Sequence, residues 1–311
     1  MADIRIAQAA PAPGRGAAPA PAPAGFPGRG GPPPRTGPVM AGELIDMILA
    51  RLNTPFRPRT NDRFVAGDPL TPVTGIATMA MTTFDGLKAA AAAKANLVLT
   101  GDATWWGDTD DLTRMEGNET FKAKRDFIKA NNLVIYRIAD HIADTSPDPI
   151  AVGMARALGW EGQATQGPDH TNFKLQPISL LALSRHVKER LGARTLRVIG
   201  DPALNVSNVA AIWGRAQQMP AIRLLRDPNV DVLMVGYTFE WEAVLYAQDQ
   251  VAIGLKKGMI LIGQIPARQA GMKNFSDWVK TVVTEVPLQH VPLAEAFWNL
   301  TDPTNLISTK I

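Results

Sequence analysis

Short apolar segments alternate with longer amphipathic segments along most of the chain. We predict strands at 73–82, 97–100, 133–138, 173–177, 195–200, 206–212, 230–236 and 259–265. The segments between them predict helices at 43–52, 85–94, 119–130, 149–158, 180–191, 216–225, 240–252 and 270–283. Strands of four to eight mostly apolar residues, separated by helices, are typical of α/β proteins. We therefore expect an α/β fold with mixed, mostly buried sheets flanked by helices.

Two of the predicted helices carry end signals. Gly159 and Gly192 directly follow the helices 149–158 and 180–191. Glycine is common at this position because it adopts the left-handed backbone conformation at little cost. Ser179 precedes the second helix and is a good N-cap residue. These signals fix the ends of both helices.

The first 40 residues differ in composition from the rest of the chain. They contain ten Pro, seven Gly and ten Ala, with four arginines against one acidic residue. The other residues then hold 28 basic and 28 acidic side chains, so the net charge of +3 belongs to this segment. Such a composition buries too little apolar surface to order by itself. We predict a Pro/Ala/Gly-rich N-terminal tail at 1–40 and a body at 41–311, whose halves cover about 41–170 and 171–311.

Three interpretations of the tail stay open. It is a flexible linker, a nucleic-acid-binding arm, or an assembly arm that lies along a neighbouring subunit. The few arginines and single aromatic residue are poor for nucleic-acid binding, and the body has no basic excess, so we do not expect a nucleic-acid partner. As an assembly arm, the tail would use Arg15, Phe26, Arg29 and Arg35.

Composition excludes several classes of function. The chain has no cysteine, which excludes disulfides, thiolate nucleophiles and Cys-ligated metal centres. No apolar run approaches the ~20 residues that a membrane-spanning helix needs. No signal peptide is readable, so we expect a cytoplasmic protein by default, or an extracellular one if a presequence has been removed. Phosphate-binding loops, a dinucleotide fingerprint and a serine nucleophile elbow are also missing.

The chain has only four histidines that could act in catalysis or metal binding. We expect structural roles for all four histidines, and a solvent-exposed position for His186, which lies among charged residues of a predicted helix. The four are His141, His170, His186 and His290.

Polar residues follow three of the predicted strands, where ligands of α/β sheets usually bind. One such segment is 101–111, which contains Asp102 and the pair Trp105-Trp106. The second is 139–144, and the third is 264–272. Trp105 and Trp106 could stack a nucleobase, but packing in the core or against another subunit is the more common role.

These segments, taken in order, resemble the Nif-three-like family, the hexameric dinuclear-metal proteins known as type 2 GTP cyclohydrolase I. The resemblance runs from about residue 41 to Trp298. The residues that carry it are Tyr136-Arg137, Asp140-His141, Pro147-Asp148, Gly153-Met154, Leu158-Gly159-Trp160, Glu240-Trp241-Glu242, Tyr246, Asp249, Gly271-Met272, Asp277-Trp278, Glu285-Val286-Pro287 and Phe297-Trp298.

The resemblance implies a toroidal hexamer with two metal ions in each subunit, but most implied ligand positions are degenerate. The first histidine pair falls on Gly101 and Asp102, and the second ligand segment on 139–143, where Ala139 and Ala143 carry no donor atom. The last segment falls on Gln264, Ala267 and Arg268. The residual candidates for metal binding are Asp102, Asp140, His141 and Asp144.

Arg268 is the decisive departure from the family pattern. It places a permanent cation where the resemblance implies a carboxylate, and a guanidinium repels divalent ions. We expect Arg268 to pair with Asp102 or Asp140 and so to close the site. We therefore expect no cofactor, the alternative being one weakly held divalent metal ion.

Two functions follow from different classes. The first is a non-catalytic pseudoenzyme that self-assembles into a homo-oligomeric ring, which stacks into a tube or filament through its N-terminal arm. Contacts that do not close on themselves propagate in this way. The alternative is a metal-dependent hydrolase or nucleotide-binding protein of the type 2 GTP cyclohydrolase I kind, with one residual metal site.

Overall fold

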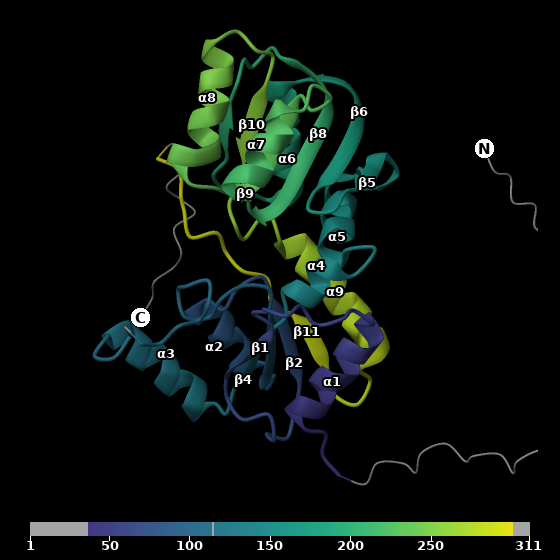
Figure 1. Cartoon of the computed structure of the whole chain (residues 1–311). Coiled ribbons are helices and arrows are strands. Elements are labelled where there is room, and N and C mark those ends of the chain that lie inside the picture. Colours follow the sequence, from purple (N-terminus) through teal and green to yellow (C-terminus); the bar gives the residue numbers. More distant parts are fainter. Residues whose placement is uncertain (1–36, 114, 301–311) are drawn as a thin grey trace, which may run out of the picture. The chain divides into compact units, whose positions relative to one another are not determined.

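The computed structural model describes residues 37–113 and 115–300 (Figure 1). Within these ranges the strands form two mixed sheets, each flanked by helices, as the sequence predicts. The strands of the first sheet are β1 (Arg63–Ala66), β2 (Ile76–Met79), β3 (Leu97–Thr100), β4 (Val134–Arg137) and β11 (Leu288–His290). Those of the second are β5 (Ala164–Gln166), β6 (Thr171–Ser179), β7 (Arg197–Ile199), β8 (Asn205–Arg215), β9 (Val232–Tyr237) and β10 (Gly258–Leu261).

The first sheet has the strand order β1-β4-β3-β2-β11. The strands β4, β3, β2 and β11 are parallel, and β1 pairs antiparallel with β4. In register, Thr100 lies opposite both Met79 and Arg137. The carboxyl ends of β2, β3 and β4 therefore lie at one edge, and the segments that start at residues 101 and 138 leave the sheet side by side.

The second sheet has the order β5-β6-β8-β9-β10-β7, in which β8, β9 and β10 are parallel and the outer pairs are antiparallel. Its central strand β9 is buried on both faces. Val232 and Met234 belong to one apolar cluster, and Leu233 and Val235 to another. This burial explains why the strand is an unbroken apolar run rather than an alternating one.

The helices agree closely with the sequence predictions. Helices α3 and α5 have the predicted bounds, and the N-cap Ser179 accepts a hydrogen bond from the Ala182 N–H, as expected. No helix in the described part of the chain has both the length and the apolarity that a membrane crossing needs. The helices are α1 (Ala41–Leu52), α2 (Phe84–Ala92), α3 (Glu119–Ala130), α4 (Asp140–Asp144), α5 (Pro149–Leu158), α6 (Leu180–Leu191), α7 (Gln218–Arg226), α8 (Leu245–Ala252), α9 (Gln269–Val282), the short 3₁₀ turn η1 (Glu161–Gln163) and the π-turn η2 (Glu240–Val244).

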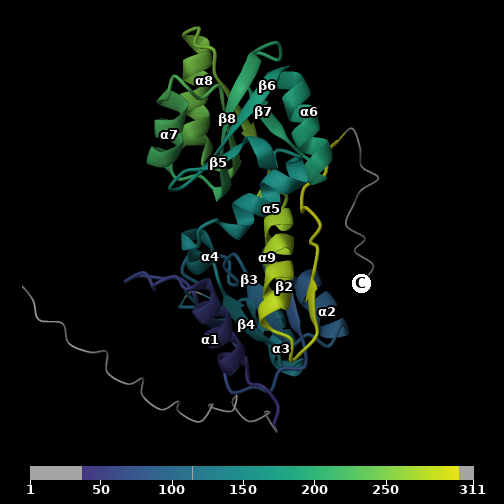
Figure 2. The same ribbon diagram turned by 90° about the vertical axis from the view of Figure 1, so that its right-hand side faces the viewer.

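Helices α5 and α9 lie side by side in both views (Figures 1 and 2). Their backbones approach closely because each has a glycine at the crossing. A Cβ atom at Gly153 would lie 2.6 Å from the Ala270 carbonyl oxygen, and one at Gly271 would lie 2.6 Å from Ile150 Cα. Helix α5 contributes to the core of both sheets, with Met154 in the first cluster and Leu158 in the second. This helix pair thus connects the two packed regions.

The two sheets are not built from consecutive halves of the chain. Strand β5, which precedes residue 171, belongs to the second sheet, whereas β11 returns to pair with β2 in the first. The strands predicted at 73–82 and 259–265 are shorter in the structure, at Ile76–Met79 and Gly258–Leu261.

Candidate functional site

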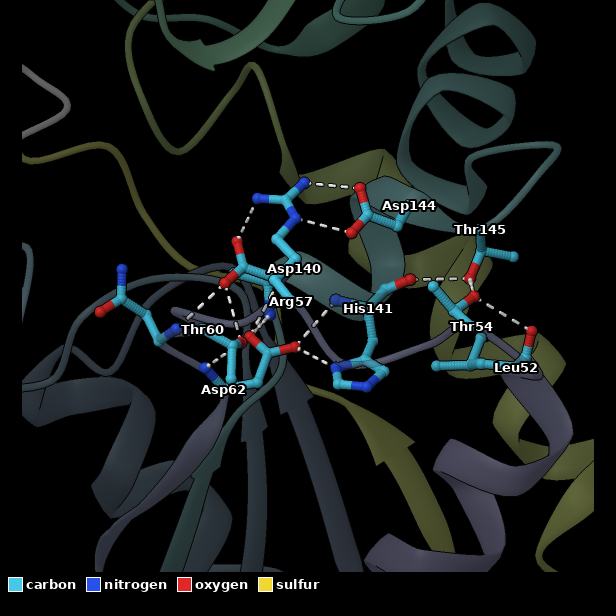
Figure 3. Close-up of polar contacts among 11 residues, drawn as sticks. Leu52, Thr54, Arg57, Thr60, Asp62, Asp140, His141, Asp144 and Thr145 are labelled. Carbon is cyan, nitrogen blue, oxygen red and sulfur yellow. Dashed lines mark hydrogen bonds and ion pairs between the residues drawn. The ribbon is translucent and has the colours of Figure 1, made fainter.

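The buried carboxylate of Asp62 organises the segment that follows β4. Its Oδ1 accepts hydrogen bonds from the backbone N–H groups of Ala139 (2.6 Å) and Asp140 (2.9 Å). Its Oδ2 accepts one from the His141 N–H at 2.8 Å and lies 2.7 Å from His141 Nδ1 (Figure 3). One side chain therefore satisfies the donors at the start of α4 and also orients the histidine.

The imidazole of His141 lies away from the carboxylates of Asp140 and Asp144 (Figure 3). The ring is 2% exposed and contacts Phe56 edge-on, with ring centroids 4.2 Å apart. Its Nε2 atom is buried, and no described residue accepts a hydrogen bond from it or donates one to it. His141 therefore packs toward the apolar side of α4. In this orientation its ring does not face the two aspartates, so the three side chains are not arranged to bind one metal ion.

Arg57 holds the two carboxylates of α4. Its Nε and Nη2 each donate to Asp144 at 2.6 Å, and its Nη1 donates to Asp140 at 2.8 Å (Figure 3). The Arg57 guanidinium lowers the pKa of the Asp144 carboxyl, mainly through this hydrogen bonding. The second oxygen of Asp140 accepts from the Thr60 hydroxyl at 2.8 Å and the Asn61 N–H at 3.0 Å. The carboxylate oxygens of both aspartates thus already accept hydrogen bonds from groups within the chain.

Asp102, Gln264 and Arg268 meet where β3 and β10 end. Gln264 Nε2 donates to Asp102 Oδ2 at 2.8 Å, and Arg268 Nε lies 4.0 Å from the same oxygen, at the limit of an ion pair. Of the two expected partners of Arg268, the structure pairs it with Asp102, whereas Asp140 is held by Arg57. The guanidinium of Arg268 is mostly buried.

A cavity of about 250 Å³ lies next to these groups. Helices α4 and α5 and the loop before β6 contribute to its wall, together with Trp213 and Arg268. Three of the predicted positions, Ala139, Ala143 and Asp144, also line it. The structure thus brings most of the implied ligand positions to one region, with His141 turned away from it.

Asp148 is an acidic residue of this cavity whose pKa is raised. It caps α5, and its Oδ1 accepts a hydrogen bond from the Ile150 N–H at 2.7 Å. Burial raises the pKa of the Asp148 carboxyl to about 6, and the nearby Arg268 charge partly offsets that rise. In the sequence, only the family resemblance marks Asp148.

The loop after β3 is fixed by two buried charges. Asp110 Oδ1 accepts from the Thr104 N–H at 2.6 Å and the Trp105 N–H at 2.8 Å. Lys124 Nζ donates to the carbonyls of Thr82 and Thr104 at 2.6 Å each. Trp105 is in the core, as its more common role predicts.

Trp106 is 52% exposed and takes a positive φ of 62°. Lys124 Nζ lies 5.1 Å from the centroid of its ring. The two tryptophans therefore have different environments: Trp105 is buried and Trp106 is exposed at the surface of the chain.

Three residues that hold this site were not predicted from the sequence: Arg57, Thr60 and Asp62. They lie in a segment without periodic pattern, about 80 residues before their partners, and only their polar side chains distinguish them. The prediction that His186 is solvent-exposed was wrong: its Nε2 lies 2.8 Å from the Leu158 carbonyl oxygen, and its ring stacks on Trp160. Arg15, Phe26, Arg29 and Arg35 lie outside the described residues.

Solved structures with a similar fold cover almost the whole body. Hypothetical protein SA1388 of Staphylococcus aureus aligns with a TM-score of 0.67 at 12% identity, over 85% of this chain and 100% of that chain. A Bacillus cereus protein related to NIF3 gives 0.66 at 12% identity, over 85% and 100%. Protein ybgI, described as of unknown function, gives 0.63 at 21% identity, over 83% and 99%. At these identities the likeness shows the fold alone.

No curated protein matches the chain. Residues 64–255, more than half of the sequence, match the family described as Duf34/NIF3 (NGG1p interacting factor 3). This match over more than half of the chain shows that the chain belongs to the DUF34/NIF3 family.

Proposed function

We propose that this chain is a non-catalytic DUF34/NIF3 protein that acts by assembling with copies of itself into a ring. Residues 1–40 would join such rings into a tube or filament. The observation that carries the proposal is the engagement of Asp140 and Asp144 by Arg57. An assembly role needs no chemistry at this site, and a guanidinium there removes the chemistry that paired metal ions would supply.

The residues at the implied ligand positions do not fit a pair of divalent ions. Gly101, Ala139 and Ala143 have no side-chain atom that could bind a metal ion, and two arginines, Arg57 and Arg268, line the same cavity. Two nearby cations would raise the energy of any bound divalent ion. In the described residues, no three His, Asp or Glu side chains converge to hold a metal ion.

Exposed aromatic residues support association between copies. Phe239 and Trp241 stack with centroids 4.7 Å apart and planes within 5°, and Trp241 is 72% exposed. Phe297 and Trp298 are exposed as well. Large aromatic side chains are enriched in the buried centres of protein interfaces, where they contribute much of the binding energy. Covering these residues would therefore favour association.

The alternative is a hydrolase or nucleotide-binding protein with one divalent ion. It is favoured by the Asp62–His141 pair, because a carboxylate behind a histidine is a common support for a metal ligand. It is disfavoured by the Phe56 ring, which packs against that imidazole, and by the loss of Asp140 and Asp144 to Arg57.

Negative-stain electron microscopy with metal analysis of the same purified sample tests the proposal. We expect rings or stacked rings with far less than stoichiometric metal. Arg57→Gln frees two carboxylates, so the single-metal alternative predicts that this variant binds more metal; Arg125→Gln, which removes an exposed pair with Asp126, is the matched control. Monomers carrying stoichiometric metal in the wild-type sample would overturn the proposal.

A further inference from the structure

The guanidinium of Arg268 occupies a space that two glycines leave open. A Cβ atom at Gly101 would lie 3.0 Å from Nη2, and one at Gly214 would lie 3.2 Å from Nη1. Gly214 also has a φ of +119°, which side-chain-bearing residues rarely adopt. Nη1 and Nη2 therefore each lie against a glycine, where any larger residue would place a side chain in the space that the guanidinium occupies.

Within residues 37–113 and 115–300, this guanidinium has one weak ion pair, and the Asp148 carboxyl is near enough to feel its charge. The paired oxygen, Asp102 Oδ2, is 4.0 Å from Nε and already accepts a hydrogen bond from Gln264. The Nε atom is buried and has no hydrogen-bond partner among the described residues, and the side chain as a whole is 15% exposed. A largely buried charge without hydrogen bonds is costly, and native structures rarely leave one unsatisfied.

The other charged groups of the adjoining cavity are satisfied. Asp144 is held by Arg57 at 2.6 Å. Asp169 accepts from Arg223 at 2.6 Å and lies 2.9 Å from His170 Nδ1. Asp148 accepts from backbone at the start of α5, and burial weakens its acidity, as described above. Of the charged side chains that line the cavity in the described chain, Arg268 alone lacks a hydrogen-bond partner.

We infer that this cavity binds a small oxyanion, a phosphate or carboxylate group, through the Nη1–Nη2 fork of Arg268. The planar fork matches the spacing of two oxygens in both groups, which is why arginine is the common receptor for them. Ala143, Ile150 and Trp213 add apolar surface to the cavity wall, which lowers the local dielectric and strengthens such a contact. The site does not depend on assembly of the protein.

The size of the cavity limits the ligand. Its volume of about 250 Å³ lies below the roughly 300–1,000 Å³ of pockets that enclose drug-sized ligands. A cavity of this size suits a free ion or a small metabolite.

Isothermal titration calorimetry of the full chain with inorganic phosphate and with malonate, at constant ionic strength, tests this inference. We expect wild-type protein to bind at least one of them and Arg268→Gln to bind at least tenfold more weakly. Gly101→Ala keeps the charge but places a methyl group 3.0 Å from Nη2, so it should also weaken binding. Arg125→Gln, on the exposed surface, should leave the affinity unchanged.

The two ligands separate the sources of the anion. Binding of phosphate alone identifies a phosphoryl site, and binding of malonate alone identifies a carboxylate site. Equal affinity in the wild type and in Gly101→Ala and Arg268→Gln, or no binding of either ion at millimolar concentration, would overturn the inference. If Arg268→Gln does not fold, Gly101→Ala still tests the inference. We expect this variant to fold, because the two atoms nearest to the new methyl group are the ends of flexible side chains.

Discussion

A single buried carboxylate, that of Asp62, determines the conformation of α4. It accepts three backbone hydrogen bonds and contacts the His141 ring, and its side chain is fully buried. Helix α4 spans only five residues, too few for internal hydrogen bonds to stabilise it. The short helix and the two aspartates that it presents to Arg57 therefore depend on Asp62.

We expect Asp62→Asn to lower the free energy of unfolding by about 2–4 kcal/mol, because the amide keeps one acceptor oxygen but turns an N–H₂ group toward backbone donors. Urea denaturation measures the change. Asp85→Asn, at an exposed position with a 3.7 Å contact to Lys88, should change stability by less than about 0.5 kcal/mol. Equal effects of the two variants would contradict the role assigned to Asp62.

Lys124 is a buried cation whose protonation affects stability. Burial lowers the pKa of its ammonium group from 10.5 to about 8. Between these values the unfolded chain binds the proton and the folded chain releases it, so the free energy of unfolding rises with pH. Below pH 8 Lys124 is protonated in both the folded and the unfolded chain, so the cost of burying its charge lowers stability in full. Above pH 10.5 Lys124 is neutral in both, and this cost is absent.

We therefore expect the stability of the wild type, relative to Lys124→Met, to increase between pH 8 and 10.5 by up to about 3 kcal/mol in total. Urea denaturation of both proteins across this range measures the difference, in which titrations common to both proteins cancel. Parallel stability curves for the two proteins would show that the Lys124 ammonium is not destabilised by its surroundings.

At the residue scale, the sequence predicts which family positions have lost their donor atoms, because a missing imidazole or carboxylate is visible in the sequence itself. It does not predict that Arg57 engages Asp140 and Asp144, since that contact joins residues more than 80 positions apart in a segment without regular pattern. The loss of metal binding stays a prediction. The pairing of Arg268 with Asp102 is present, but at the limit of an ion pair.

At the element scale, the α5–α9 crossing depends on two glycines whose lack of a side chain lets the backbones touch. Gly153→Ala would place its methyl group 2.6 Å from the Ala270 carbonyl oxygen and 2.8 Å from Gly271 Cα. These are backbone atoms, so the helices must separate. We expect a loss of about 1–3 kcal/mol, despite the better helix propensity of alanine.

Thermal or urea denaturation checks this prediction. Gly42→Ala in α1 is the matched control, because its nearest neighbour, the Pro69 carbonyl oxygen, lies 3.4 Å from the new methyl group. That variant should gain up to about 1 kcal/mol from helix propensity alone. A stabilised Gly153→Ala variant would show that the crossing tolerates a side chain.

Elements with strong periodicity and clear end signals are the ones that the sequence predicts. Helix α5 and strand β3 have the predicted bounds, because a capping residue marks the first and the apolar run Leu97-Val98-Leu99 marks the second. The short elements β1, β5 and α4 were missed. Each is held by partners distant in sequence: β1 by the register of β4, β5 by β6, and α4 by Asp62. Local pattern carries no signal for such contacts.

At the scale of the whole molecule, family and fold follow from several motifs in the right order, and both were confirmed. The return of β11 to the first sheet was not predicted. This return brings the C-terminal part of the body against its N-terminal part, because α9 and β11 pack on a sheet whose other strands precede residue 138. The body carries no net charge, so long-range repulsion does not oppose association of its copies.

The proposed assembly divides between body and tail, and the two contributions can be separated. A chain that starts at residue 37 should still form rings, because the exposed Phe239–Trp241 stack remains, but it should lose longer particles. Phe239→Ser with Trp241→Ser should instead lose the rings, since the apolar area of an interface is removed. Negative-stain electron microscopy with light scattering measures particle size for both variants. Long particles that persist without residues 1–36 would refute the role of the tail, and intact rings in the double variant would place the ring contact elsewhere on the body.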